Sequence, residues 1–219
     1  MLFTELNSDV WENQKKILKT FSKKYCIGTD EVGRGCLAGP VVTAAVLFTS
    51  DKRIPVSDSK KLGKQKREKI FYEIIQSNPI VGIAFTHQSM IDKVNILNAT
   101  KLAMEKSLFR CLKGLKNFIK PEDVIVCIDG NFLLTPLMDI RQISIIKGDA
   151  YVASISAASI VAKVTRDRYM SSMNRFYSGY GLDRNKGYGT KEHIMAIYNF
   201  GITPFHRKSF CRGMLNASH

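Results

Sequence analysis

The 219-residue sequence is poor in cysteine, and its five cysteines are too scattered for the common cysteine chemistries. No two of them have the two-residue gap of a zinc knuckle or a redox motif, and their odd number excludes a fully paired disulfide framework. Free cysteine behaves as a small apolar side chain. We therefore expect reduced, mostly buried thiols at Cys26, Cys36, Cys111, Cys127 and Cys211.

Long apolar runs are also missing. The longest one, from Cys36 to Phe48, contains Gly39, Pro40 and Thr43 and falls well short of the ~20 residues that span a bilayer. The first ten residues hold two acidic side chains and no basic one, unlike the basic and apolar regions of a secretory signal. These absences predict a cytoplasmic protein with no membrane segment.

Acidic residues are scarce, because 19 Asp and Glu face 33 Lys and Arg, which gives a formal charge of +14 and a pI of about 9.6. Such an excess favours a polyanionic partner, above all nucleic acid. A Walker phosphate loop is absent, the four histidines lack zinc spacing, and no Ser-His-Asp arrangement is visible. These observations argue against a P-loop nucleotidase, a zinc site and a serine hydrolase.

The chain alternates between expected strands and helices, without internal repeats or a low-complexity linker. Residues 1–24 read as an amphipathic helical extension, and residues 25–219 as a single domain with a helical C-terminal part. Two strands joined by the glycine-rich turn 33–39 predict an antiparallel hairpin. The alternation that follows predicts an α/β fold with a central sheet flanked by helices.

Four carboxylates fall at the ends of three expected strands. Asp30 and Glu31 stand at the end of the first strand, Asp129 closes the fourth, and Asp149 follows the fifth. An acidic cluster in a protein that approaches phosphates needs divalent cations, and hard oxygen ligands favour Mg²⁺ or Mn²⁺. Two such ions would suit an in-line phosphoryl displacement. Each acid alone is equally typical of a turn, and Asp30 and Glu31 reach one site only if the strand bends, for which Gly28, Gly33 and Gly35 are candidates.

Several other features suit a phosphate or a sugar. Gly33-Arg34-Gly35 would let a ligand approach the backbone, although a tight hairpin explains it as well. Lys60 lies in a basic loop that enters a Lys-rich helix, and Lys163 and Arg166 lie one turn apart on a later helix. Tyr188, between two glycines, could stack on a base or a sugar.

Seven motifs, in their order along the chain, resemble the signature of one enzyme family. They are GTDEVGRG (28–35), DSKKL (58–62), NILNAT (95–100), IDGN (128–131), KGD (147–149), SAASIVAKVTRD (156–167) and KGY (186–188). Together they are similar to bacterial type 2 ribonuclease H, ribonuclease HII, over roughly residues 25–210.

The resemblance implies a ribonuclease H-like fold with a central mixed sheet. It also implies an endonuclease that cuts RNA in RNA–DNA hybrids and nicks duplex DNA 5′ of a single ribonucleotide, leaving a 3′-hydroxyl and a 5′-phosphate. By the same resemblance, Asp30, Glu31, Asp129 and Asp149 are the metal-binding catalytic acids. Gly33, Arg34 and Gly35 would sense the ribose 2′-hydroxyl, and Tyr188 would pack on the adjacent sugar.

Three alternatives remain open at this stage. Ribonuclease HIII typically has a Lys between the two glycines and a larger N-terminal domain, so Arg34 and the short extension favour type HII. A junction resolvase would share the acids without a ribose sensor, and a basic binding module would show salt-sensitive binding without turnover. Residues 210–219 show no convincing sliding-clamp peptide, and a monomer is the default expectation.

Overall fold

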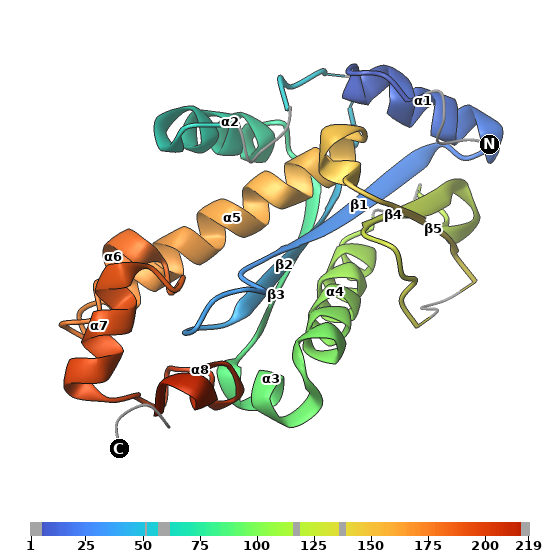
Figure 1. Cartoon of the computed structure of the whole chain (residues 1–219). Helices are drawn as coiled ribbons and strands as arrows, with labels where there is room; N and C mark the ends of the chain where they lie inside the picture. The colour runs from blue at the N-terminus through green and yellow to red at the C-terminus, as the bar shows by residue number, and fades with distance from the viewer. Residues whose placement is uncertain (1–5, 51, 57–61, 116–118, 136–138, 216–219) are drawn as a thin grey trace.

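A five-stranded mixed sheet forms the centre of the molecule (Figure 1). The structure, a computed structural model, describes residues 6–50, 52–56, 62–115, 119–135 and 139–215. The spatial order of the strands is β3-β2-β1-β4-β5. Their bounds are β1 Tyr25–Val32, β2 Val41–Leu47, β3 Ile80–Thr86, β4 Val124–Asp129 and β5 Arg141–Ile145.

The strands β1, β2 and β3 form an antiparallel meander, whereas β4 and β5 run parallel to β1. The predicted hairpin and mixed sheet are therefore confirmed. The β1–β4 ladder ends at the pair Thr29–Ile128, while β1 continues beside β2 as far as Val32. The last residues of β1 thus lie at the edge of an opening between two diverging strands.

Two long helices cover the two faces of the sheet (Figure 1). The helix α5, Ala153–Met173, packs on β1 and β2, and α4, Ile96–Lys113, packs on β2 and β3. In α5 almost the whole first half is buried, which explains its run of Ser and Ala: small side chains let the helix backbone approach the sheet closely. Gly28 is the closest point, because a Cβ added there would lie 2.1 Å from the carbonyl carbon of Ser154.

Gly28 therefore admits α5 to the sheet, and β1 keeps its pairing with β2 through Asp30 and Glu31. Both acids keep their pairing with β2, and the bend expected of the strand stays a prediction. The opening beside them begins where the ladder between β1 and β4 ends, at Thr29.

The remaining helices surround this layer. They are α1 Val10–Thr20, α2 Lys64–Gln76, α3 Gln88–Val94, α6 Leu182–Asn185, α7 Lys191–Phe200 and α8 Lys208–Leu215, with short 3₁₀ turns at Pro121–Asp123 and Gly148–Ala150. The helix α1 lies at the start of α5, where the Gln14 side chain accepts a hydrogen bond from the Ser154 amide at 2.8 Å. The sequence did not single out α3, α6 or α8 as separate helices.

All five cysteines are free and buried, as predicted. Among the described residues no helix is long and apolar enough to cross a membrane.

Candidate active site

A cleft of about 430 Å³ opens where β1 and β4 diverge. Asp30 and Glu31 line it from β1, and Asp129 lines it from the end of β4. The carboxyl ends of these parallel strands meet at one edge of the sheet, which is why acids 99 positions apart in sequence share one wall. The other lining residues are Val32, Gly33, Arg34, Gly35, Arg67, Ser159, Lys163 and Tyr188.

Asp149 is near these acids but does not line the cleft. It lies in the 3₁₀ turn before α5 with 2% of its surface exposed, and its backbone carbonyl accepts a hydrogen bond from the Ser156 hydroxyl. The preceding residue, Gly148, donates its amide to Asp129 Oδ1 at 2.6 Å, so this turn and the end of β4 are directly joined.

The pKa of Asp30 is strongly perturbed. Burial raises its pKa well above the ordinary value, and the negative charges of Glu31, Asp129 and Asp149 raise it further. A hydrogen bond from the Ser159 side chain acts in the opposite direction. Ionised Asp30 is thus penalised in the bare protein, and a cation bound beside it would remove that penalty.

The four acids supply the hard oxygen ligands that Mg²⁺ and Mn²⁺ prefer, so their chemistry fits such an ion. Within the described residues, however, no three His, Cys, Asp or Glu side chains are already arranged to hold a metal. Protein donors hold the oxygens instead: Asp30 Oδ1 accepts the Glu31 amide at 2.7 Å, and Glu31 Oε1 lies 3.3 Å from Arg34 Nη1. An incoming cation has to compete with these donors.

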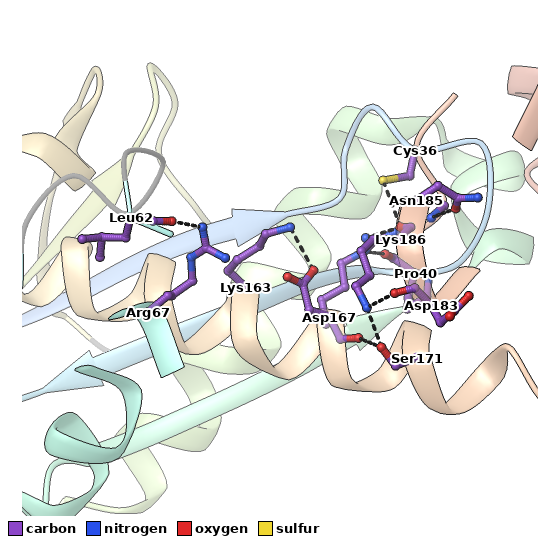
Figure 2. A network of polar contacts seen from close by, with 12 residues as sticks. Cys36, Pro40, Leu62, Arg67, Lys163, Asp167, Ser171, Asp183, Asn185 and Lys186 are labelled. Carbon is purple, nitrogen blue, oxygen red and sulfur yellow. Dashed lines mark hydrogen bonds and ion pairs between the residues drawn. The ribbon is translucent and has the colours of Figure 1, made fainter. Parts of the chain in front are cut away.

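Basic groups surround the acids. Arg34, Arg67 and Lys163 line the same cleft from the β1–β2 loop, α2 and α5. Figure 2 shows Arg67, which donates to the Leu62 carbonyl at 2.6 Å, and Lys163, which pairs with Asp167 at 2.9 Å. This ion pair leaves the Lys163 side chain at the wall of the cleft.

Tyr188 also lines the cleft. The residue is 38% exposed, and its ring centroid lies 5.7 Å from Lys163 Nζ. Burial raises the pKa of its hydroxyl to about 12, so the ring stays neutral across the physiological range. An aromatic face open to a polyanion-binding cleft can stack on a sugar or a base.

This combination of carboxylates, cations and an aromatic ring at one strand edge agrees with the comparison to known families. A sequence model described as "Ribonuclease HII" matches residues 27–213. The chain belongs to the ribonuclease HII family. It is therefore an enzyme, an endonuclease of the ribonuclease H type.

Relatives and solved structures agree with the family. Ribonuclease HII of Ligilactobacillus salivarius is 45% identical over 204 residues, which are 91% of this chain and 76% of that protein. The ribonuclease H2 structure from Pyrococcus horikoshii has a TM-score of 0.66 at 26% identity, covering 89% of this chain and 99% of that one. The Bst-RNase HIII structure in complex with Mn²⁺ has a TM-score of 0.68 at 18% identity, covering 100% of this chain and 73% of that one, and shows the shared fold alone.

The ribonuclease HII match favours that family over ribonuclease HIII, as Arg34 indicated. The structure brings together nine of the ten predicted site residues in or beside the cleft, with Asp149 behind its wall. The tenth, Lys60, lies outside the described residues.

Two residues correct the sequence-based interpretation. Arg166, expected beside Lys163 as part of the basic face, is fully buried and binds backbone carbonyls. Arg207, one of the basic residues whose excess indicated a polyanionic partner, is also fully buried. The sequence did not predict Ser159 as a partner of Asp30. The signal that could have found it is its position one helical turn after Ser156 on α5.

Proposed function

We propose that this enzyme hydrolyses the RNA strand of RNA–DNA hybrids and nicks DNA duplexes 5′ of a single ribonucleotide, leaving 3′-hydroxyl and 5′-phosphate ends. The observation that carries the proposal is the single cleft that combines Asp30, Glu31 and Asp129 with the loop 33–35 and Tyr188. Acids alone would suit many nucleases. A glycine-flanked backbone and an aromatic ring beside them suit recognition of a sugar, and the 2′-hydroxyl is the group that distinguishes RNA from DNA.

We assign Asp30, Glu31, Asp129 and Asp149 as the residues that hold divalent ions, Mg²⁺ or Mn²⁺, with two ions during the reaction. When bound, such ions supply an activated water and neutralise charge at the scissile phosphate. The raised pKa of Asp30 and the like charges around it support this assignment, because a cation relieves both. Ser159 keeps the Asp30 carboxylate oriented.

The other residues act on the substrate. Arg34 and Lys163 would contact phosphates, as would Lys60, which lies outside the described residues, and the backbone from Gly33 to Gly35 would approach the ribose. Tyr188 would pack on the sugar next to the cut. The formal charge of +14 would add salt-dependent affinity along the duplex. Residues 25–219 form the catalytic unit of this proposal, which acts as a cytoplasmic monomer, and residues 1–24 are an extension.

The test uses a DNA duplex with one ribonucleotide, an RNA–DNA hybrid and an all-DNA duplex, each with Mg²⁺, with Mn²⁺ and with chelator. End-labelling maps the cut. We expect a metal-dependent nick immediately 5′ of the ribonucleotide and none in all-DNA. Tight binding without a cut in either metal would indicate a binding module, and cleavage of all-DNA would indicate a junction-type nuclease.

A second experiment tests the metal assignment without measuring activity. Mg²⁺ and Mn²⁺ should raise the melting temperature of the wild type and raise that of Asp129→Asn much less. Asp123→Asn is the matched control, because Asp123 lies at the opposite end of β4 and pairs with Lys24 at 3.2 Å. An equal metal-induced shift in the wild type and Asp129→Asn would refute the assignment of Asp129.

A further inference from the structure

The loop between β1 and β2 is held from behind by two buried arginines. Arg207 precedes α8 and Arg166 belongs to α5, and both side chains have 0% exposed surface. The loop includes residues 33–35, which line the cleft on its other side. Neither arginine lines the cleft, so neither is placed to touch a substrate.

Arg207 donates to three carbonyls of this loop. Its Nη2 lies 2.6 Å from the Gly33 oxygen, its Nη1 2.7 Å from the Arg34 oxygen, and its Nε 2.9 Å from the Gly39 oxygen. The backbone amide of Arg207 also donates to the Leu37 carbonyl at 2.8 Å. One residue thus ties the loop together from its first position to its seventh.

Arg166 holds the same loop from the helix side. Its Nε donates to the Pro40 carbonyl at 2.9 Å, and its Nη2 donates to the Ala38 carbonyl at 3.2 Å. Its Nη1 donates to the backbone carbonyl of Lys186, two residues before Tyr188, at 2.8 Å. Figure 2 shows Pro40 and Lys186 in this network. Gly33 has a φ of +91°, and a Cβ there would lie 2.2 Å from Arg166 Nε, so the guanidinium also fills the space behind this glycine.

The hydrogen bonds from Arg207 are strong because their donor is a charged guanidinium that is buried away from solvent. Burial lowers the pKa of Arg207 to about 10, with Arg166 contributing in the same direction, so Arg207 stays protonated at neutral pH. A buried guanidinium is tolerated only when its donors are satisfied, and here backbone carbonyls satisfy them. The loop conformation and the arginine charge therefore stabilise each other.

The hydrogen bonds from Arg207 also orient the backbone amides of the loop, because of the geometry of the peptide bond. In a planar trans peptide the C=O and the following N–H point in opposite directions. The carbonyls of Gly33 and Arg34 point at Arg207, so the amides of Arg34 and Gly35 point to the opposite side of the loop. These residues line the cleft, which gives it two oriented hydrogen-bond donors beside the acids.

We propose that Arg207 is a positioning residue for ribose recognition, which orients the amides of Arg34 and Gly35 toward the sugar, while Arg166 fixes the same loop relative to the Tyr188 segment. The inference rests on the proposed function, because it assigns the residue that positions the groups that distinguish ribose from deoxyribose. It predicts that the arginine affects the distinction between ribose and deoxyribose more than it affects affinity for duplex phosphates.

The test substitutions are Arg207→Lys and Arg207→Gln, because lysine keeps the charge but cannot serve two adjacent carbonyls with a planar fork. The full chain is assayed with Mg²⁺ for kcat and KM on a single-ribonucleotide duplex, and by anisotropy in chelator for binding to this duplex and to all-DNA. The binding preference for the ribonucleotide duplex should fall about tenfold, as expected for one or two misaligned hydrogen bonds. Affinity for all-DNA should stay within about twofold.

The control is Leu108→Ala, which creates a cavity beside α4 on the other face of the sheet. It should lower stability without changing the loop between β1 and β2. A merely structural role of Arg207 predicts the same result as this control, namely less folded enzyme with an unchanged ribose preference. That result for Arg207→Lys would overturn the proposal. A wild type without any ribose preference would instead refute the proposed function.

A milder variant decides the question if the Arg207 variants do not fold. Asp92 on α3 accepts the amides of Lys208 and Ser209 at 2.9 and 3.0 Å, and so fixes the segment that carries Arg207. Asp92→Ala should loosen this segment and lower the ribose preference several-fold. An unchanged preference in folded Asp92→Ala protein would overturn the proposal in that case.

Discussion

The close approach of α5 to the sheet makes Gly28→Ala the sharpest test of the packing. A Cβ at position 28 would lie 2.1 Å from the Ser154 carbonyl carbon and 2.2 Å from the Ile155 nitrogen, whereas ordinary contact begins at 3.4 Å. Backbone atoms cannot rotate away, so α5 has to retreat by about 1.3 Å. We expect a loss at the upper end of the overpacking range, about 3 kcal/mol of unfolding free energy.

The local conformational preferences of alanine and glycine alone predict that Gly28→Ala stabilises the protein. Alanine is favoured over glycine inside a strand, and it lowers the entropy of the unfolded chain, which together would stabilise the protein by about 0.5–1 kcal/mol. Urea denaturation distinguishes the two. With an m-value of about 2–3 kcal/mol/M, the clash should lower the midpoint by about 1 M or more. A midpoint equal to or above that of the wild type would refute the close-packing argument.

Two further glycines make the comparison specific to the active site. Gly82→Ala meets the Ser107 carbonyl oxygen of α4 at 2.0 Å, so it should destabilise to a similar degree from the other face of the sheet. Only α5 carries Ser159 and Lys163 to the cleft, so activity per folded molecule should fall in Gly28→Ala and persist in Gly82→Ala. Gly213→Ala, in α8 with no described atom within 4 Å of the new methyl group, should be neutral or slightly stabilising.

Three more predictions address the site and its support. Asp30→Asn should abolish turnover yet raise the metal-free melting temperature at neutral pH, because it removes a buried charge whose pKa is raised; a lower melting temperature would contradict this. Tyr188→Ala should impair cleavage at an isolated ribonucleotide more than cleavage of long hybrids, and equal losses would exclude a ribose-packing role. Burial lowers the pKa of His193, and lowers that of His206 to about 4, below the unfolded value of about 6.5. The contribution of these histidines to stability should therefore be constant above pH 6.5 and fall toward pH 4, by up to about 3 kcal/mol from His206. Asp30, whose pKa is raised, acts in the opposite direction. The measurement is therefore the difference in urea midpoint between the wild type and His206→Gln, which should be larger at pH 7.5 than at pH 5.

The histidine effect has a clear structural origin. His193 Nε2 and His206 Nε2 lie 3.1 Å apart in the core, and His206 Nδ1 is 3.0 Å from the Thr203 amide, which donates to it. One proton between the two Nε2 atoms satisfies both neutral rings, whereas a second proton there would set two N–H donors against each other and create a buried imidazolium. The same difference in urea midpoint between the wild type and His206→Gln at both pH values would contradict this arrangement.

Much of the candidate site followed from the sequence, because strand ends are local signals. The apolar segments before Asp30 and Asp129 indicate strands, and parallel strands bring their carboxyl ends to one edge. The Ser and Ala run of α5 is also a local pattern, but its close packing on β1 and β2 is visible only in the structure. The ordered motifs then identified the family.

Only the tertiary structure decided the roles of Gly28, Arg166 and Arg207. A basic residue reads as solvated from its type alone, because burying a charge is unfavourable unless distant groups satisfy it. For Arg207 those groups are carbonyls 168–174 positions away in the chain, so no local pattern contains them. The sequence by itself determined which elements form and where their acids stand. The three-dimensional packing determined which charges face the substrate and which hold the loop that faces it.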